Sequence, residues 1–240
     1  MNGSMYNRIE KERPLKWDFD MLVETFVSEQ YKWLAENLVP DTVAIDIGAY
    51  IGDSSIYLAQ QSKIIKVLAY EAHPRIWERG TKLMSFVQKS TKNKIYYKMG
   101  AMVGSKIKSS VDNIDGVKTT KSGPIFQATP NFIYLNKSSK KRNIPIYHLY
   151  RILDKLSKNP IAIKCDVEGD EYNIFMDDKL DLYKYKNVYI MQIEYHMKKT
   201  LKDLSKCIRG YGFKVKSEKF QENTPRGHDQ IGWLYAYRDI

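Results

Sequence analysis

One segment, residues 42–71, constrains the fold of this chain more than any other. A β-branched run leads into a turn bracketed by Gly48 and Gly52, and a helical pattern follows the turn. A second apolar run ends in an acid, Glu71, nineteen residues after Gly52. In a βαβ unit that binds a nucleotide, an acid at this place accepts hydrogen bonds from the ribose hydroxyls. The segment therefore predicts a parallel α/β sheet with a nucleoside pocket.

The glycine spacing indicates a cofactor that has a ribose but no phosphate. The pattern Gly-x-x-x-Gly differs from the Gly-x-Gly-x-x-Gly of dinucleotide sites, and no Gly-Lys-Ser/Thr of a P-loop follows. Asp53 begins the predicted helix, where its carboxylate would repel a phosphate. S-adenosylmethionine fits these conditions. The alternative is that the glycines only shape a turn, that Asp53 caps the helix and that Glu71 is a solvated strand end. The residues predicted to bind the cofactor are Asp46, Gly48, Ala49, Tyr50, Gly52, Glu71 and Ala101.

The length of 240 residues fits one α/β domain, residues 1–240, which begins with a helical segment at residues 1–40. The predicted strands span residues 43–47, 65–71, 94–101, 161–166, 187–194, 213–217 and 231–237. The predicted helices span residues 18–38, 53–60, 74–87, 149–156, 170–176 and 199–210. Their alternation predicts right-handed crossovers and a mostly parallel sheet.

The positive charge is concentrated in one region. Residues 104–147 hold eight Lys/Arg against two Asp, a net of +6 out of +11 for the chain. The connection is too long for one crossover and contains turn signals, so it predicts a basic, β-rich insertion with a hairpin. Its lysines are either a solvated face or a rim that attracts an anionic acceptor.

Targeting and redox signals point to an ordinary intracellular setting. The first residues lack the apolar stretch of a signal peptide, and no apolar run is long enough for a membrane span. The two cysteines, Cys165 and Cys207, have no metal or redox spacing. We therefore expect a soluble, cytoplasmic protein.

Acids and a histidine follow two of the predicted central strands. Ligands of an open parallel sheet bind beyond the carboxyl ends of its strands, so these side chains should converge there. The residues predicted to be catalytic are Asp166, Glu168, His196, Lys164 and Glu194. His196 or Asp166 would be the general base, with Lys164 holding a carboxylate. Alternatively, Lys164 and Asp166 form a structural ion pair, His196 is a hydrogen-bonded loop residue, and the carboxylates hold Mg²⁺.

Several motifs together resemble one family over roughly residues 40 to 200. They are Asp46-Ile-Gly-Ala-Tyr-Ile-Gly52, Glu71, Gly100-Ala-Met-Val-Gly104, Ile163-Lys-Cys-Asp-Val-Glu-Gly-Asp-Glu171 and Ile193-Glu-Tyr-His196. In order and spacing these residues resemble the FkbM-type class I S-adenosylmethionine-dependent methyltransferases. The resemblance implies a Rossmann-like, seven-stranded sheet and methyl transfer to a hydroxyl of a small molecule or glycan. One position departs from the family, because Tyr150 stands where an acid is usual.

Two other functions remain open at this point. The net charge and the aromatic residues of the basic insertion also suit an RNA methyltransferase, in which aromatic side chains would stack on bases. A non-catalytic binding protein that kept the methyltransferase fold is the third hypothesis. The acid set around Asp166 argues against it, because a binder has no need of such a set.

Overall fold

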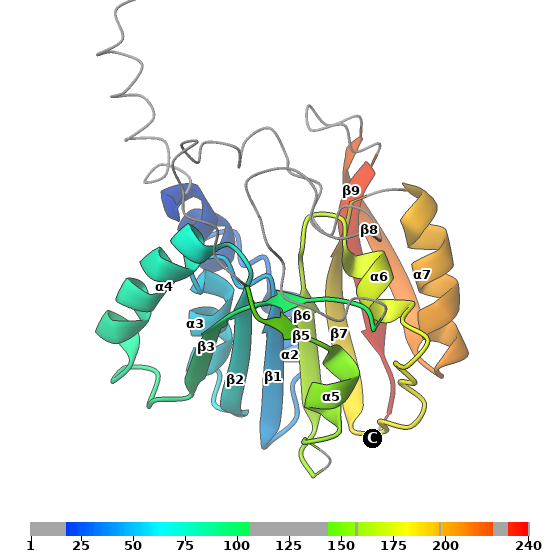
Figure 1. The fold of residues 1–240 in the computed structure, drawn as a ribbon, viewed down its shortest axis with the longest axis horizontal. Helices are drawn as coiled ribbons and strands as arrows, with labels where there is room; N and C mark the ends of the chain where they lie inside the picture. The colour runs from blue at the N-terminus through cyan, green and yellow to red at the C-terminus, as the bar shows by residue number, and fades with distance from the viewer. Residues whose placement is uncertain (1–17, 106–143, 157, 197, 223–229, 240) are drawn as a thin grey trace, which may run out of the picture.

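The computed structural model describes residues 18–105, 144–156, 158–196, 198–222 and 230–239. Within these residues the chain forms a seven-stranded sheet in the order β3-β2-β1-β6-β7-β9-β8 (Figure 1). The strands are β1 (Thr42–Ile47), β2 (Ile64–Glu71), β3 (Ile95–Met99), β6 (Ile161–Cys165), β7 (Val188–Tyr195), β8 (Lys214–Glu222) and β9 (Gln230–Tyr237). The helices are α2 (Lys32–Glu36), α3 (Asp53–Gln60), α4 (Pro74–Val87), α5 (Leu149–Leu153), α6 (Glu171–Phe175) and α7 (Lys198–Gly210).

The sheet is parallel except at one edge. Strands β3, β2, β1, β6 and β7 pair in parallel, whereas β9 runs antiparallel to β7 and β8 runs antiparallel to β9. The predicted mostly parallel, seven-stranded sheet of a class I methyltransferase fold is therefore confirmed. Because parallel strands end at the same edge, the residues after β1, β2, β6 and β7 come together there.

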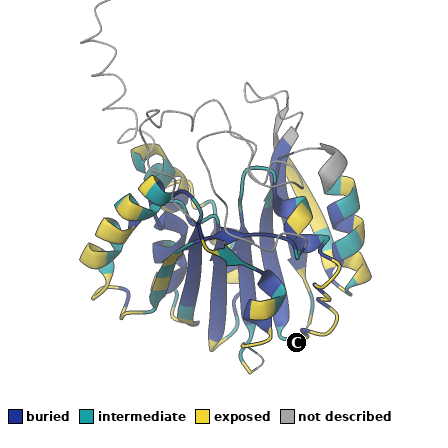
Figure 2. Cartoon of the chain, viewed as in Figure 1, coloured by how far each residue is buried: buried dark blue, intermediate teal, exposed yellow. Residues whose placement is uncertain are grey.

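Alternate residues of the central strands fill two cores, one on each face of the sheet. Val43, Ile45 and Ile47 belong to the larger core, which also takes in buried residues of α5, α6 and α7. Ala44, between them, belongs to a second core with Leu34 of α2 and with residues of α3. The central strands are accordingly buried on both faces, while the outer sides of the helices are exposed (Figure 2).

The prediction of one continuous helix over residues 18–38 is wrong, because the chain forms two shorter helices there. Residues 18–26 are helical, and α2 begins only at Lys32. Between the two helices Glu29 has a left-handed backbone, with φ of 51°, which ends a helix. The break turns Tyr31 inward, where it is 3% exposed and packs against Trp233 and Tyr57.

The predicted strand over residues 94–101 also ends early. Strand β3 stops at Met99, and Ala101 begins a separate strand, β4 (Ala101–Met102), which pairs in parallel with β5 (Ile146–Tyr147). The chain leaves the sheet at Gly100, where a Cβ atom would lie 2.2 Å from the Tyr147 ring. Only glycine allows the two segments to approach so closely.

Most of the predicted basic insertion, residues 104–147, lies outside the described residues, and so does its predicted hairpin. At its ends the described residues form β4 and β5. Among the described residues, no helix is both long enough and apolar enough to cross a bilayer.

Candidate active site

The turn between β1 and α3 is anchored on both sides by backbone contacts. The N–H groups of Gly48 and Ala49 both donate to Tyr70 O of β2, each at 3.0 Å. Gly48 has φ of +76°, and a Cβ atom there would lie 1.7 Å from Asp166 O. Asp166 N in turn donates to Ile47 O at 2.9 Å. The predicted cofactor turn and the loop after β6 therefore meet backbone to backbone.

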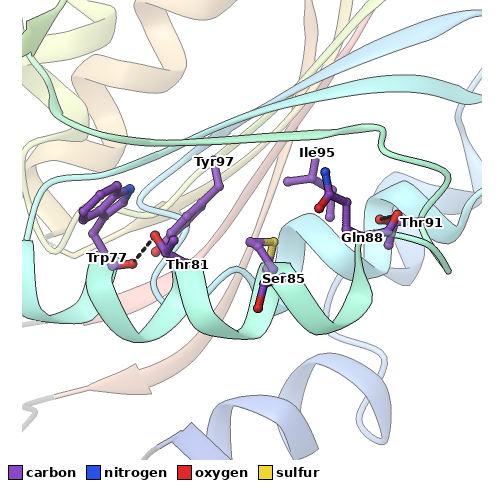
Figure 3. Close-up of a pocket in the computed structure, with 8 residues that line it drawn as sticks. Trp77, Thr81, Ser85, Gln88, Thr91, Ile95 and Tyr97 are labelled. Carbon is purple, nitrogen blue, oxygen red and sulfur yellow. Dashed lines mark hydrogen bonds between the residues drawn. The ribbon is translucent and has the colours of Figure 1, made fainter.

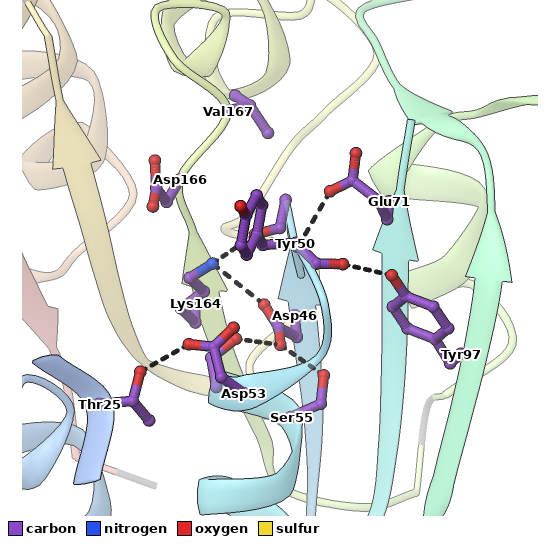
Figure 4. Close-up of polar contacts among 12 residues, drawn as sticks. Thr25, Asp46, Tyr50, Asp53, Ser55, Glu71, Tyr97, Lys164, Asp166 and Val167 are labelled. Carbon is purple, nitrogen blue, oxygen red and sulfur yellow. Dashed lines mark hydrogen bonds and ion pairs between the residues drawn. The ribbon is translucent and has the colours of Figure 1, made fainter. Parts of the chain in front are cut away.

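Lys164 lies beneath this turn, on β6. Its Nζ donates to Gly48 O at 2.6 Å and forms an ion pair with Asp46 Oδ1 at 3.3 Å (Figure 4). The sequence suggested Asp166 as its partner, but the structure pairs it with Asp46. Burial lowers the pKa of Lys164, but Asp46 and other nearby acidic groups outweigh this and raise it well above its usual value. Lys164 is thus a charged group that supports the turn from inside.

The side chain of Asp46 is enclosed by donors. Its Oδ2 accepts hydrogen bonds from the hydroxyls of Ser54 and Ser55 in α3, both at 2.6 Å. Gly52, with φ of +92°, precedes these residues and lets the chain enter α3. Asp46 is 0% exposed, so its carboxylate ties β1 to α3 and to Lys164.

Glu71 ends β2 beside the turn, as the sequence predicts. Its Oε1 accepts from His73 N at 2.6 Å, and its Oε2 accepts from Tyr50 N at 2.9 Å. Burial raises the pKa of Glu71 from 4.5 to about 7. Each carboxylate oxygen has a second lone pair, so two further hydroxyl donors can be accepted.

Asp53 lies in the first turn of α3, as predicted. Its Oδ2 accepts a hydrogen bond from the Thr25 hydroxyl at 2.6 Å (Figure 4). Burial raises the pKa of Asp53 to about 6. The helical residues 18–26 therefore contact the start of α3 directly.

Beyond β6 and β7 the predicted catalytic residues gather around one imidazole. His196 Nε2 lies 3.6 Å from Glu168 Oε2, 3.7 Å from Glu194 Oε1 and 3.9 Å from Asp166 Oδ1. The other ring nitrogen, Nδ1, lies 2.9 Å from Glu171 Oε1. The structure thus brings together Asp166, Glu168, Glu194 and His196, whereas Lys164 belongs to the turn. We call these four residues and Glu171 the acid–histidine cluster.

Burial and charge set the protonation of this cluster. Burial lowers the pKa of His196, but the carboxylates, Glu171 above all, outweigh it and raise the pKa to about 10. The carboxylates thus favour the protonated form of His196 when no cation is bound. Burial, with Asp166 nearby, raises the pKa of Glu194 well above its usual value. Asp166 and Glu168 are the accessible members, with side chains 26% and 33% exposed.

Glu171 is the member of the cluster that sequence reasoning missed as a site residue. It is 3% exposed, and its Oε1 accepts from Val167 N and Gly169 N at 3.1 Å each. Burial raises its pKa, but His196 outweighs this and lowers it overall. The signal was present, because Glu171 closes the Lys-x-Asp-Val-Glu-Gly-x-Glu element. Glu171 links the His196 ring to the backbone of the loop after β6.

Two other features lie outside this arrangement. Ala101 is fully buried in a small apolar cluster with Val103 and Ile144. A pocket of about 270 Å³ lies between α4 and β3 (Figure 3). It is lined by Trp77, Thr81, Met84, Ser85, Gln88, Thr91, Ile95 and Tyr97. None of the predicted site residues lines it.

Comparison with known families identifies the class of protein. The model of the FkbM methyltransferase domain matches residues 46–215, and the chain belongs to this family. The match spans the glycine turn, Glu71 and the acid–histidine cluster. The predicted relationship is therefore confirmed, and the chain carries an S-adenosylmethionine-dependent methyltransferase fold. A search of curated protein sequences finds no match.

One solved structure with a TM-score above 0.5 agrees with this fold. A methyltransferase FkbM from Methylobacillus flagellatus is 16% identical, with a TM-score of 0.52, and covers 83% of this chain and 44% of its own. A precorrin-6y C5,15-methyltransferase from Geobacter metallireducens is 13% identical, with a TM-score of 0.45 and coverage of 85% and 84%. An rRNA methylase from Streptococcus thermophilus is 10% identical, with a TM-score of 0.47 and coverage of 89% and 96%. Likenesses this distant leave the acceptor undetermined.

Proposed function

We propose that this protein transfers a methyl group from S-adenosylmethionine to a hydroxyl of a small molecule or glycan. One observation carries the proposal: the turn beside Glu71 and the acid–histidine cluster are joined at the contact of Gly48 with Asp166 O. A methyl donor held over the turn would then lie next to side chains that can accept a proton. Membership of the FkbM family supports a hydroxyl acceptor.

The residues around the turn fit the cofactor. Glu71 presents a carboxylate with lone pairs free of its two backbone donors, which suits the paired hydroxyls of a ribose. Gly48, Ala49, Tyr50 and Gly52 would shape the floor of the pocket, while Asp46 would hold that floor in place. The cofactor supplies a methyl group activated by a sulfonium. No phosphate group has to be accommodated at the start of α3, where Asp53 lies.

The acid–histidine cluster would remove the proton from the acceptor hydroxyl. Methyl transfer is an in-line displacement, so the rate depends on aligning the oxygen and on freeing its lone pair. Asp166 is an accessible carboxylate, and its backbone N–H donates to Ile47 O just before the turn. Glu168 and Glu194 would bind or orient the acceptor, and Glu171 would keep His196 in place.

The same cluster fits a divalent cation. The ligand atoms of Asp166, Glu194 and His196 all lie within 4.8 Å of one another. Two carboxylates and an imidazole are ligands that Mn²⁺ and related ions accept. A bound cation would lower the pKa of an acceptor hydroxyl. Asp166 and Glu194 would hold it, with Glu171 fixing the tautomer of His196.

Thermal unfolding with added ligands tests the proposal. A ligand that binds only the native state raises the unfolding temperature by mass action. We expect S-adenosylhomocysteine to raise it and NAD to leave it unchanged, with Mn²⁺ as a third arm for the cation. A shift with NAD alone would refute the cofactor assignment. Methyl-labelled S-adenosylmethionine with a panel of hydroxylated and anionic acceptors, and with mixed RNA, would then separate the acceptor classes.

A further inference from the structure

Tyr50 is an unusual residue in the cofactor turn. It is not glycine, yet its φ is 47°, in the left-handed region. A residue other than glycine keeps this conformation only where its surroundings hold it. Its N–H donates to Glu71 Oε2 at 2.9 Å, and its carbonyl accepts from the Tyr97 hydroxyl. The backbone conformation of Tyr50 therefore sets the position of one of the two N–H groups that donate to Glu71.

The side chain of Tyr50 is held by a residue far away in the sequence. Its hydroxyl donates to Asp18 Oδ1 at 2.9 Å. The same oxygen forms an ion pair with Arg79 NH2 of α4, also at 2.9 Å. The Asp18 side chain is 17% exposed and that of Arg79 is 34% exposed. Asp18 thus joins the amino-terminal helical residues, the turn and α4 at one point.

A second contact from the same helix supports this arrangement. Asp18 and Thr25 are seven residues apart, so they lie on one face of the helical residues 18–26. The Thr25 hydroxyl donates to Asp53 Oδ2 at 2.6 Å, and both residues are buried, at 1% and 5% exposure. One face of this helix therefore touches the turn at Tyr50 and at the start of α3.

We infer that Asp18 is a positioning residue for the cofactor, acting through Tyr50 on the N–H that holds Glu71. The family match begins at residue 46, so this helix lies outside the matched residues. The inference rests on the proposed function, because Glu71 is the residue proposed to bind the ribose. Asp18 itself needs no contact with the ligand.

Calorimetric titration of S-adenosylhomocysteine into the full chain tests the inference. Asp18→Asn removes the charge of the acceptor and Tyr50→Phe removes the donor, so each variant should weaken binding by up to about tenfold. Because both variants act on the same hydrogen bond, the double variant should bind no more than about twofold more weakly than the weaker-binding single variant. Asp20→Asn is the matched control, since Asp20 lies on the same helix and is exposed.

If Asp18 has only a structural role, Asp18→Asn should lower the unfolding temperature, and the effects of the two variants on S-adenosylhomocysteine affinity should show no coupling. In turnover assays we expect a higher KM for S-adenosylmethionine with kcat unchanged. Wild-type affinity in both single variants, fully additive losses, or an equal loss in Asp20→Asn would each overturn the inference alone. If the wild-type chain binds no S-adenosylhomocysteine, the proposed function fails and the inference falls with it.

Discussion

The carboxylates near β1 and β2 are paired differently from those near β6 and β7. In the first region each acid has donors of its own: Lys164 and two serines for Asp46, Thr25 for Asp53, and two backbone N–H groups for Glu71. In the second region four carboxylates crowd around His196, each with an oxygen within 3.9 Å of a ring nitrogen.

The difference separates a prepared binding surface from a reactive one. Acids with donors of their own hold the turn in one conformation before any ligand arrives, which reduces the cost of binding. Carboxylates crowded around one imidazole repel one another, in keeping with the raised pKa of Glu194, and an acceptor proton or a cation can relieve this repulsion. We therefore expect substitutions in the first region to change cofactor affinity or stability, and substitutions in the second to change turnover.

The largest expected effect lies in the acid–histidine cluster. Asp166→Asn keeps the shape of the side chain but removes a proton acceptor, so turnover with an identified acceptor should fall by about 10²–10⁴-fold. Methyl transfer from labelled cofactor measures this. Glu36→Gln is the control, because Glu36 is exposed at the end of α2, shortly before β1 begins. Full turnover in Asp166→Asn would mean that another residue removes the proton, and it would contradict the difference proposed between the two regions.

Next in size is the buried ion pair under the turn. Lys164→Met leaves the Asp46 carboxylate buried without its cation, which should lower the free energy of unfolding by about 3–5 kcal/mol. Chemical denaturation measures the loss. Lys184→Met removes the exposed partner of Asp154 and should cause little measurable change. Similar stability of the two variants would mean that Lys164 does not support the turn.

The smallest expected effect is the pH dependence of cofactor binding. Ribose hydroxyls donate to an ionised carboxylate, and the pKa of Glu71 is raised by burial to about 7. Affinity for S-adenosylhomocysteine should therefore fall by up to about tenfold per pH unit below 7 and level off above it. In folding, the same raised pKa contributes stability below pH 4.5 that is lost as the pH rises through 7.

Calorimetry between pH 5.5 and 8.5 would follow the binding effect. Glu71→Gln has no titrating group at this position, so its affinity should be weak and nearly independent of pH over the same range. A wild-type profile identical in slope to that of the variant would show that Glu71 does not titrate on binding.

The sequence predicted the sheet well because strand periodicity and glycine turns are local signals. The strands around Gly48 and Glu71 and the acids after β6 and β7 were placed correctly, since parallel strands end at one edge. The break at Glu29 was missed because a left-handed glutamate has no sequence signature. The end of β3 was missed because the close approach of Gly100 to Tyr147 depends on residues far apart in the chain.

Within the site, the sequence identified residue types better than partners. The sequence offered Asp166 as one possible partner of Lys164 because the two share a strand face, whereas its partner Asp46 lies on the neighbouring strand β1. The pairing of Lys164 with Asp46 follows from strand order, which one sequence does not contain. Glu171 was passed over because its function depends on the fold of the loop around it. Contacts with Asp18 and Thr25 were equally invisible, because they join segments that only the fold brings together.

The most direct test of the account is one calorimetric comparison of S-adenosylhomocysteine binding to the wild type, Glu71→Gln and Asp166→Asn. The account predicts that Glu71→Gln weakens binding by about 1–3 kcal/mol, because the charge is lost and one acceptor oxygen becomes an NH₂ donor, while Asp166→Asn binds like the wild type. Equal weakening in both variants, or weakening in Asp166→Asn alone, would contradict the division between a cofactor region and a reactive region.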